Sequence, residues 1–516
     1  MDTNVAMTAP PVEEGHLRKS LGLFSATTLV IGSMIGSGIF IVSADISRSV
    51  DSPALLIAAW VLSALITIVA ALSYGELAAM MPKAGGQYVY LREALGPVVG
   101  FLYGWTLFLV IQTGLIAAVG VAFAKFLGVF FPSVNPQHWL LHLGHVPALH
   151  VGTVVVGDLE VGVNSANLVA MIVIAVITVV NLFGVKLGAL VQNVFTVAKA
   201  LALFGLIVLG VTLGRNPAAI AANFGAGWHN FWQHSGGLHA VQIGVGGSTV
   251  LVGVLTILAV TQVGSLFSSD AWNNVTFTAG EIRNPSRNLP LSLVLGTGFV
   301  LTMYIAVNFV YLMVLPLHGD ANGTTIFARG IQYASADRVG TAVLESIFAS
   351  KGAYLMAGAV LISAFGCING MVLAGARVFY AMSKDGLFFG MVGRLHPKYD
   401  TPFVSLLLQG FWAMVLCMSG SYGQLLDYVV FASLMFYILT IVSLFVLRRT
   451  QPDVPRPYKA IGYPVLPALY IVTAAFICGV LLVYKPQYTW PGLFLVLLGL
   501  PVYFFWSRSQ AAVART

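Results

Sequence analysis

The chain has 516 residues, of which 58% are hydrophobic and only 8% are charged. A soluble protein carries about 25% charged residues, so this composition excludes a set of ordinary water-soluble domains and indicates a polytopic membrane protein. The net charge of +7 comes from basic residues scattered between apolar runs, which is typical of membrane topology and not of a nucleic-acid-binding surface.

Apolar segments almost free of charge follow one another along the whole chain. A helix of about 20 apolar residues crosses a bilayer core of about 30 Å, and each segment is long enough. The segments are 20–44, 52–75, 94–124, 161–185, 187–214 (interrupted by Lys199), 216–269 (helical from about Gly247), 288–319, 352–376, 401–426, 428–447, 460–484 and 486–507. We therefore expect an all-α polytopic fold with twelve transmembrane helices.

The basic residues predict the orientation of these helices. An even number of spans places both termini on one side, and most of the 25 lysines and arginines fall in connections on that side. By the positive-inside rule both termini are cytosolic, in a membrane of the bacterial inner (plasma) type. The N-terminal segment contains Glu13 and Glu14 and has no small-residue cleavage site, so we expect no removable signal peptide.

The first span contains three glycines within seven residues, in the sequence GSMIGSGIF from Gly32 to Phe40. One interpretation is close helix packing, because Gly32 and Gly36 form a small-xxx-small pair. The other is a broken helix, since dense glycines weaken a helix and unpaired backbone at membrane depth is tolerated where it lines a cavity. A half-helix starting near Gly38 would direct N–H groups and a positive dipole end at an anion.

The sixth span is interrupted by polar residues in the sequence LFSSDAWNN, from Leu266 to Asn274. Intramembrane carboxylates such as Asp270 cost about 2.5–3.5 kcal/mol on insertion scales and usually mark function, although packing of a polar helix face is the alternative. Two interrupted helices five spans apart are typical of an inverted five-plus-five repeat, in which the substrate binds between the breaks.

A lysine stands inside the fifth span. Lys199 lies about 16 Å beyond the cytosolic edge at 1.5 Å per residue, which is too deep for its side chain to reach water easily. We expect Lys199 to contact a functional site. A charge buried at a helix crossing is the alternative.

These motifs resemble the amino acid–polyamine–organocation superfamily, and most of all its L-type amino acid transporter branch. The resemblance covers roughly residues 20–450. Its motifs are GSMIGSGIF in the first span, PKAGGQYVYLREALGP (Pro82 to Pro97), VKLGALVQNVFTVAKALAL (Val185 to Leu203), AWNNVTFTAGEIRNPSRNLP (Ala271 to Pro290) and FGCINGMVLAGARVFYAMSKDG (Phe365 to Gly386).

The resemblance implies a leucine-transporter-type five-plus-five inverted repeat with broken first and sixth helices. It assigns the substrate carboxylate to backbone N–H groups near Gly36, Ser37 and Gly38, and the amine to carbonyls near Ser33, Met34 and Phe267. Phe267 also resembles an aromatic lid. Lys199 resembles a lysine that replaces a sodium ion, which implies that it reaches the carbonyls near Ser33 to Ile35, with Ser363 of the eighth span nearby. The full candidate set for substrate binding is Ser33, Met34, Ile35, Gly36, Ser37, Gly38, Phe267, Ser268, Asp270 and Ser433.

The corresponding division of the chain is a cytosolic tail (1–19), a first repeat (20–214), a second repeat with its preceding external loop (215–447), two further spans (448–507) and a cytosolic tail (508–516).

Two departures from the relatives stand out. Asp270 occupies a position where close animal relatives have glycine. The connection between the third and fourth spans lacks the cysteine that heavy-chain-linked relatives carry there, and Cys367, Cys417 and Cys478 all lie in apolar segments.

The function expected from these features is secondary transport of L-amino acids, preferably neutral ones, by alternating access. Transport would be sodium-independent and either exchange or proton-coupled; the alternative is a carrier of cationic amino acids or polyamines that uses Asp270. An intramembrane enzyme is disfavoured because HExxH, GxSxG and paired intramembrane aspartates are missing, and a channel because no filter motif is present. We expect no cofactor, metal, nucleic acid or disulfide-linked heavy chain, and the sequence does not indicate an oligomeric state.

Overall fold

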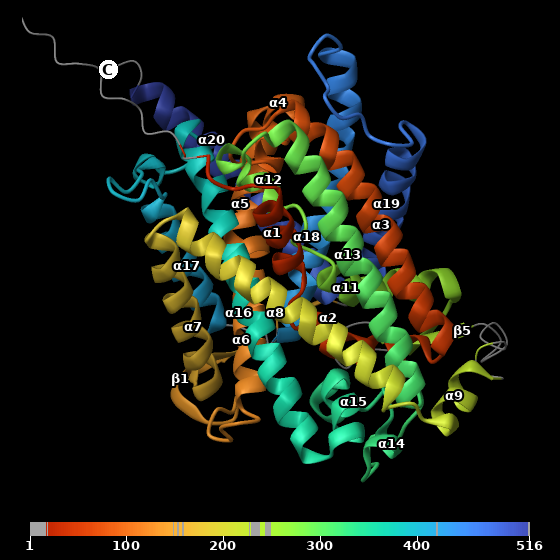
Figure 1. Cartoon of the computed structure of the whole chain (residues 1–516). Helices are drawn as coiled ribbons and strands as arrows, with labels where there is room; N and C mark the ends of the chain where they lie inside the picture. The colour runs from red at the N-terminus through yellow and green to blue at the C-terminus, as the bar shows by residue number, and fades with distance from the viewer. Residues whose placement is uncertain are drawn as a thin grey trace, which may run out of the picture.

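The structure is a computed structural model, and it describes residues 17, 19–147, 149–151, 154–156, 159–225, 228, 238–242, 249–418 and 422–513. Most of the expected N-terminal tail and the last three residues therefore lie outside the described part. Long helices dominate the remainder and run in one bundle (Figure 1).

Within the described residues, nine helices are long and apolar enough to cross a membrane. They are α3 (Pro53–Met80), the continuous pair α5 (Pro97–Thr106) and α6 (Gln112–Leu127), α7 (Ser165–Leu182), α8 (Val185–Thr212), α13 (Pro285–Val314), α16 (Ser350–Lys384), α18 (Tyr422–Thr450), α19 (Val465–Tyr484) and α20 (Pro486–Val513). A π-helical turn, Leu107–Ile111, joins α5 to α6.

Three further segments complete the expected twelve spans. The first is a bent pair, α1 (Leu23–Met34) and α2 (Gly38–Val50), whose axes differ by 40°. The others are the shorter apolar helices α11 (Val254–Ser268) and α17 (Phe403–Cys417). The expected all-α fold with broken first and sixth helices is thus confirmed, whereas the division into repeats stays a prediction.

Several span boundaries differ from the expected ones, for example the end of the ninth span at Cys417 and not at Leu426, and two of the differences have a local cause. The tenth helix begins at Tyr422, so Asp427 lies inside α18 although it was expected to separate two spans. Charge is a poor boundary marker near a helix end, where a carboxylate is tolerated in the first turns. The sixth span becomes helical only at Val254, because the β-branched stretch Thr249–Gly253 forms strand β6 and not the start of the helix.

The connections carry the remaining elements. On the side of the molecule opposite the C-terminus lie two helices, α14 (Ile326–Arg329) and α15 (Val339–Phe348) (Figure 1). Antiparallel hairpins pair β1 (Trp139–Val146) with β4 (Leu159–Asn164), β2 (Leu149–Val151) with β3 (Val154–Val156), and β5 (Leu238–Gln242) with β6. The other short helices are α4 (Gln87–Leu95), α9 (Pro217–Phe224) and α12 (Asn274–Phe277).

Helix α8 shows how the sequence orients a span in this bundle. Its polar residues Gln192, Thr196 and Lys199 recur at helical spacing, lie on one face and are buried. Its large apolar residues such as Leu201 and Phe204, 64% and 56% exposed, cover the opposite face. A lipid-facing helix needs an apolar outer face, so the polar face must turn inward, where α8 packs against α1 and α16.

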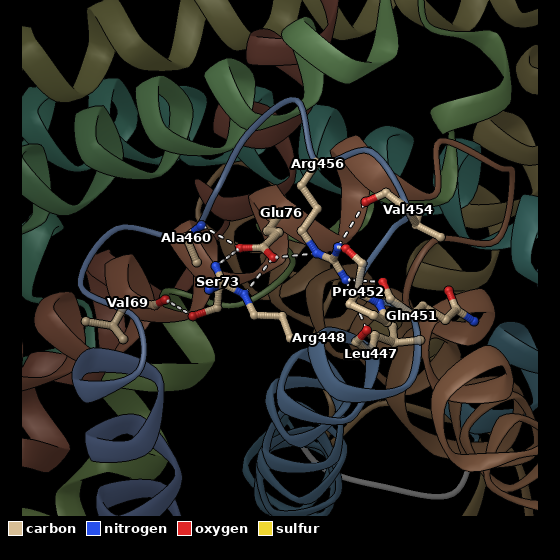
Figure 2. Close-up of polar contacts among 10 residues, drawn as sticks. All are labelled: Val69, Ser73, Glu76, Leu447, Arg448, Gln451, Pro452, Val454, Arg456 and Ala460. Atoms are coloured by element: carbon tan, nitrogen blue, oxygen red, sulfur yellow. Dashed lines mark hydrogen bonds and ion pairs between the residues drawn. The ribbon is translucent and has the colours of Figure 1, made fainter.

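A buried carboxylate fixes one end of the bundle (Figure 2). Glu76 on α3 is fully buried and accepts two hydrogen bonds from the guanidinium of Arg448 on α18, at 2.9 and 2.5 Å. It also accepts one from the backbone N–H of Ala460, at 2.6 Å, and forms an ion pair with Arg456 at 3.3 Å. Because Arg456 caps the carbonyls of Leu447 and nearby residues, Glu76 ties α3 to the end of α18 and to the loop that follows.

Replacing this carboxylate should weaken the fold. Glu76→Gln removes the charge that compensates two arginines, so we expect the free energy of unfolding to fall by about 3 kcal/mol. Glu93→Gln is the matched control: Glu93 forms a partly exposed ion pair with Arg92, so the change should be within about 0.5 kcal/mol. Thermal unfolding of the detergent-purified variants measures the difference, and equal melting temperatures would show that Glu76 has no structural role.

Candidate substrate-binding site

The first span is broken where the glycines indicated. Helix α1 ends at Met34, Ile35 adopts an extended conformation (φ −75°, ψ 94°), and α2 begins at Gly38 as expected. A helix end leaves its last carbonyls and the next helix start leaves its first N–H groups without intrahelical partners. The break therefore places both kinds of backbone group in the middle of the bundle.

Side chains from three other helices bind the carbonyls at this break. Lys199 on α8 donates to the carbonyls of Gly32 at 2.5 Å and Ile35 at 2.8 Å, and to that of Ser363 at 3.3 Å. Lys199 is only 1% exposed. The expected contact between Lys199 and the break is therefore present, although it involves Gly32 and not Ser33. The ammonium holds α1 against α8 and α16.

The other carbonyls of the break also have protein partners. The Ser363 hydroxyl donates to Ile35 at 3.1 Å and to Gly36 at 3.2 Å. The Cys367 thiol donates to the carbonyl of Ser33 at 3.1 Å, and the Tyr304 hydroxyl to that of Met34 at 3.0 Å. The carbonyls of Ser33, Met34 and Gly36 each accept one of these bonds, and a carbonyl has two lone pairs, so these three keep acceptor capacity for a further donor.

The glycines serve both of the expected purposes. A Cβ atom at Gly32 would collide with Gln192 and Thr196 on α8, so this glycine permits close packing of the two helices. A Cβ at Gly38 would collide with the side chain of Ser268, which lies at the end of α11. Gly38 therefore permits the two breaks to approach each other.

The sixth span is interrupted just beyond α11. Residues Ser269–Asn273 are not helical, and Ala271 has a positive φ of 63° before α12 begins at Asn274. Asp270 lies at this break, is 7% exposed, and accepts a 2.5 Å hydrogen bond from the hydroxyl of Tyr437 on α18. Asp270 therefore has a partner inside the protein.

A cavity between the two breaks brings most of the candidate residues together. From the first break it is lined by Ser33, Met34, Gly36, Ser37 and Gly38, and from the sixth span by Phe267, Ser268, Asp270 and Ala271. Leu115, Val119, Cys367 and Met371 complete the lining. The volume open to the centre of a water molecule is ≈ 20 Å³, so the cavity has room for about one water.

Three candidates lie outside this lining. Ile35 points its carbonyl to Lys199 and Ser363, and Lys199 lies behind the break. Ser433 on α18 lines two neighbouring cavities, both of which also include Asp270 and Tyr437. Asp270 is thus the point at which the three cavities meet.

Sequence reasoning missed Tyr304, Cys367 and Tyr437, which bind the breaks from α13, α16 and α18. A tyrosine hydroxyl buried in an apolar span needs a hydrogen-bond partner, so a tyrosine in such a segment indicates a buried polar contact. The partner could not be identified, because the bonds from these three side chains join residues more than 160 positions apart.

A buried ion pair lies at the far end of the sixth span. Arg377 on α16 donates to both carboxylate oxygens of Glu281, at 2.9 and 3.1 Å, and both side chains are 1% exposed. The carbonyl of Glu281 accepts bonds from the backbone of Ser20 and Leu21, which precede α1. The entry to α1 and the exit of the sixth span are therefore fastened to each other and to α16.

Comparison with known proteins agrees with this architecture. The chain matches the amino acid permease family over residues 21–504. It belongs to this family. The permease is 27% identical to the serine/threonine exchanger SteT of Bacillus subtilis, over 97% of this chain and 99% of the relative.

Two mammalian relatives point to the same branch of transporters. The mouse b(0,+)-type amino acid transporter 1 is 27% identical over 95% of this chain and 88% of its own length. The human large neutral amino acids transporter small subunit 2 is 27% identical over 95% of this chain and 80% of its own length. The expected superfamily and L-type branch are thereby confirmed, and the family consists of permeases and not enzymes.

Proposed function

We propose that this permease moves L-amino acids, preferably neutral ones, across the membrane by alternating access, without sodium, by exchange or proton coupling. The observation that carries the proposal is the pair of helix breaks, whose backbone groups line the same small cavity. Its lining includes the start of α2, whose first N–H groups suit a carboxylate, and carbonyls of the first break, which suit an ammonium group. An α-amino acid carries both groups on one carbon atom.

Sodium independence is supported by the position of Lys199. In carriers with broken helices, unwound carbonyls coordinate the coupling cation. Here the Lys199 ammonium already binds the carbonyls of Gly32, Ile35 and Ser363 with its three N–H donors. A sodium ion at these carbonyls would have to displace a buried positive charge.

The names of the relatives support neutral substrates and exchange. The Bacillus subtilis relative is called a serine/threonine exchanger, and the human relative is called a transporter of large neutral amino acids. Serine, threonine and large neutral amino acids have uncharged side chains. We extend this preference to the present chain.

The proposal is tested with the purified single chain in liposomes. Labelled L-serine should accumulate saturably, with excess unlabelled L-serine as competitor and no sodium on either side. Activity of the chain alone would also support the expectation that no disulfide-linked heavy chain is needed. Uptake that does not saturate would indicate a channel, and strict dependence on sodium or on a glycoprotein partner would contradict the proposal.

Asp270 motivates the second candidate, transport of cationic amino acids or polyamines, because its carboxylate lines all three central cavities. Its bond with Tyr437 favours a structural role instead. We therefore expect Asp270→Asn to keep the substrate order and to lower the free energy of unfolding by about 1 kcal/mol, the difference between a charged and a neutral hydrogen bond.

Competition with L-lysine and L-serine measures this preference. Asp45→Asn is the matched control, since the Asp45 side chain is 76% exposed. A variant that lost L-lysine competition selectively would favour the cationic alternative.

The expected cytosolic termini are tested with a membrane-impermeant label at either end of the chain in intact cells.

A further inference from the structure

A larger cavity lies away from the helix breaks, in the segment that carries α14 and α15. It is lined by Thr324, Thr325, Ile326, Arg329, Ala334, Ser335, Arg338, Thr341, Ala342 and Glu345. Its volume, measured to the centre of a water molecule, is ≈ 250 Å³, against ≈ 20 Å³ for the cavity between the breaks. This cavity can therefore hold a small solute and not only water.

The charges that face this cavity do not neutralise one another directly. Among the described residues, Arg329, Arg338 and Glu345 form no ion pair within 4 Å. The Nε atoms of the two arginines donate to the carbonyls of Gly323 and Ser335, at 2.7 and 3.4 Å, which leaves their terminal nitrogens free of protein acceptors in the described part. Two cationic groups and one carboxylate are thus open to a ligand.

Arg338 and Glu345 are half-buried, so water only partly solvates their charges. Burial raises the pKa of Glu345, and the charge of Arg338 opposes that rise. Burial likewise lowers the pKa of Arg338, and Glu345 opposes that fall. The two groups therefore interact across the cavity without contact, and a solute with complementary charges would stabilise both.

An unpaired hydroxyl lies just behind the wall of the cavity. Thr341 on α15 is 4% exposed, and its hydroxyl has no hydrogen-bond partner within the described part of the chain. The hydroxyl oxygen is closed to water, so it lies behind the wall of the cavity and does not itself contact a solute there.

We propose that this cavity is a second binding site, separate from the helix breaks, for the zwitterionic head group of an α-amino acid. Arg329 and Arg338 bind the carboxylate with planar N–H donors, and Glu345 binds the ammonium group. A simple anion would face the Glu345 carboxylate, and a simple cation would face two arginines. The inference rests on the proposed function in one respect, the choice of an amino acid as the solute.

The location connects the site to the broken first span. Arg48 near the end of α2 donates to Asp337 and to the carbonyl of Gln332, both at 2.7 Å, and the Gln332 amide donates to Asp51 at 2.7 Å. The segment with the cavity is therefore attached to the second half of the broken helix. A solute bound to Arg338 therefore lies one residue from Asp337, which binds Arg48 of α2.

Cysteine protection tests the proposal. Ser335→Cys places a thiol at an exposed position of the lining, whereas the three natural cysteines lie within helices and are buried or half-buried. We expect L-serine to slow alkylation of this cysteine by a hydrophilic maleimide about tenfold at 90% occupancy. Adding Arg338→Ala or Glu345→Gln should abolish the protection. Adding Arg215→Ala, which removes a charge outside the lining, should preserve it.

The Lys199→Ala variant distinguishes this site from the cavity between the helix breaks. Protection should persist with Lys199→Ala, which is expected to stop transport. Protection that is lost with Lys199→Ala but kept with Arg338→Ala would overturn the proposal, because it would report movement driven from the central cavity. If the parent transports but L-serine gives no protection, only this inference fails; if protection holds without transport, only the proposed function fails.

Analogues define the chemical class. N-acetyl-L-serine lacks the ammonium group and L-serine amide lacks the carboxylate, so both should protect poorly. Equal protection by inorganic phosphate or N-acetyl-L-serine would show a simple anion site and would overturn the zwitterion assignment.

Discussion

Lys199→Ala is expected to reduce uptake of labelled L-amino acids to near background, with or without sodium. The variant removes the ammonium that binds the carbonyls of Gly32, Ile35 and Ser363. A hydrogen bond to a charged group contributes about 1.5–3 kcal/mol, so the loss of two short ones frees the break from α8, although Ser363 and Cys367 still bind it from α16. Buried carbonyls would then lack their cation, and the cavity that depends on the break would lose its shape.

Lys186→Ala is the matched control, because Lys186 stands on the same helix and its side chain is exposed. Uptake into liposomes and elution as a folded species in detergent should be measured for both variants. Uptake at the parent rate in Lys199→Ala would make the lysine a packing residue. The parent distinguishes the two roles of the lysine: uptake that follows an imposed pH gradient would favour Lys199 as a proton carrier, and uptake that ignores the gradient would make it a fixed cation.

Gly38→Val should abolish transport and leave the protein folded. A side chain at this position collides with the hydroxyl of Ser268 and meets its Cα at 3.2 Å, so it must push the two breaks apart. It also fills the space in which the first N–H groups of α2 would meet a carboxylate. The rest of α2 packs against α3, α11 and α15, which is why we expect the fold to persist.

Gly298→Val provides the control, since a Cβ atom there meets nothing within 4 Å. Labelled uptake, thermal stability and competition by amino acid amides should be compared. The carboxylate assignment requires that amides compete poorly in the parent; amides that compete as well as the acids would remove it. Parent-rate uptake by Gly38→Val would show that substrate does not pass between the breaks.

The number and kind of spans followed from the sequence because membrane insertion depends on local composition. Apolar length, the glycines around Gly36 and the polar group at Asp270 are each readable within one helix. The depth of Lys199 followed from the helical rise of about 1.5 Å per residue. Each of these features depends only on residues that lie close together in the sequence.

The tertiary structure decided which groups meet. Tyr437 and Asp270 are 167 positions apart, and Glu76 and Arg448 are 372 apart. Nothing local in a buried tyrosine or arginine specifies its partner, because hydrogen bonds and ion pairs at such separations depend on how helices cross. The cavity under α15 has the same origin: Arg329, Arg338 and Glu345 are ordinary residues of a connecting segment until the chain folds them around one space.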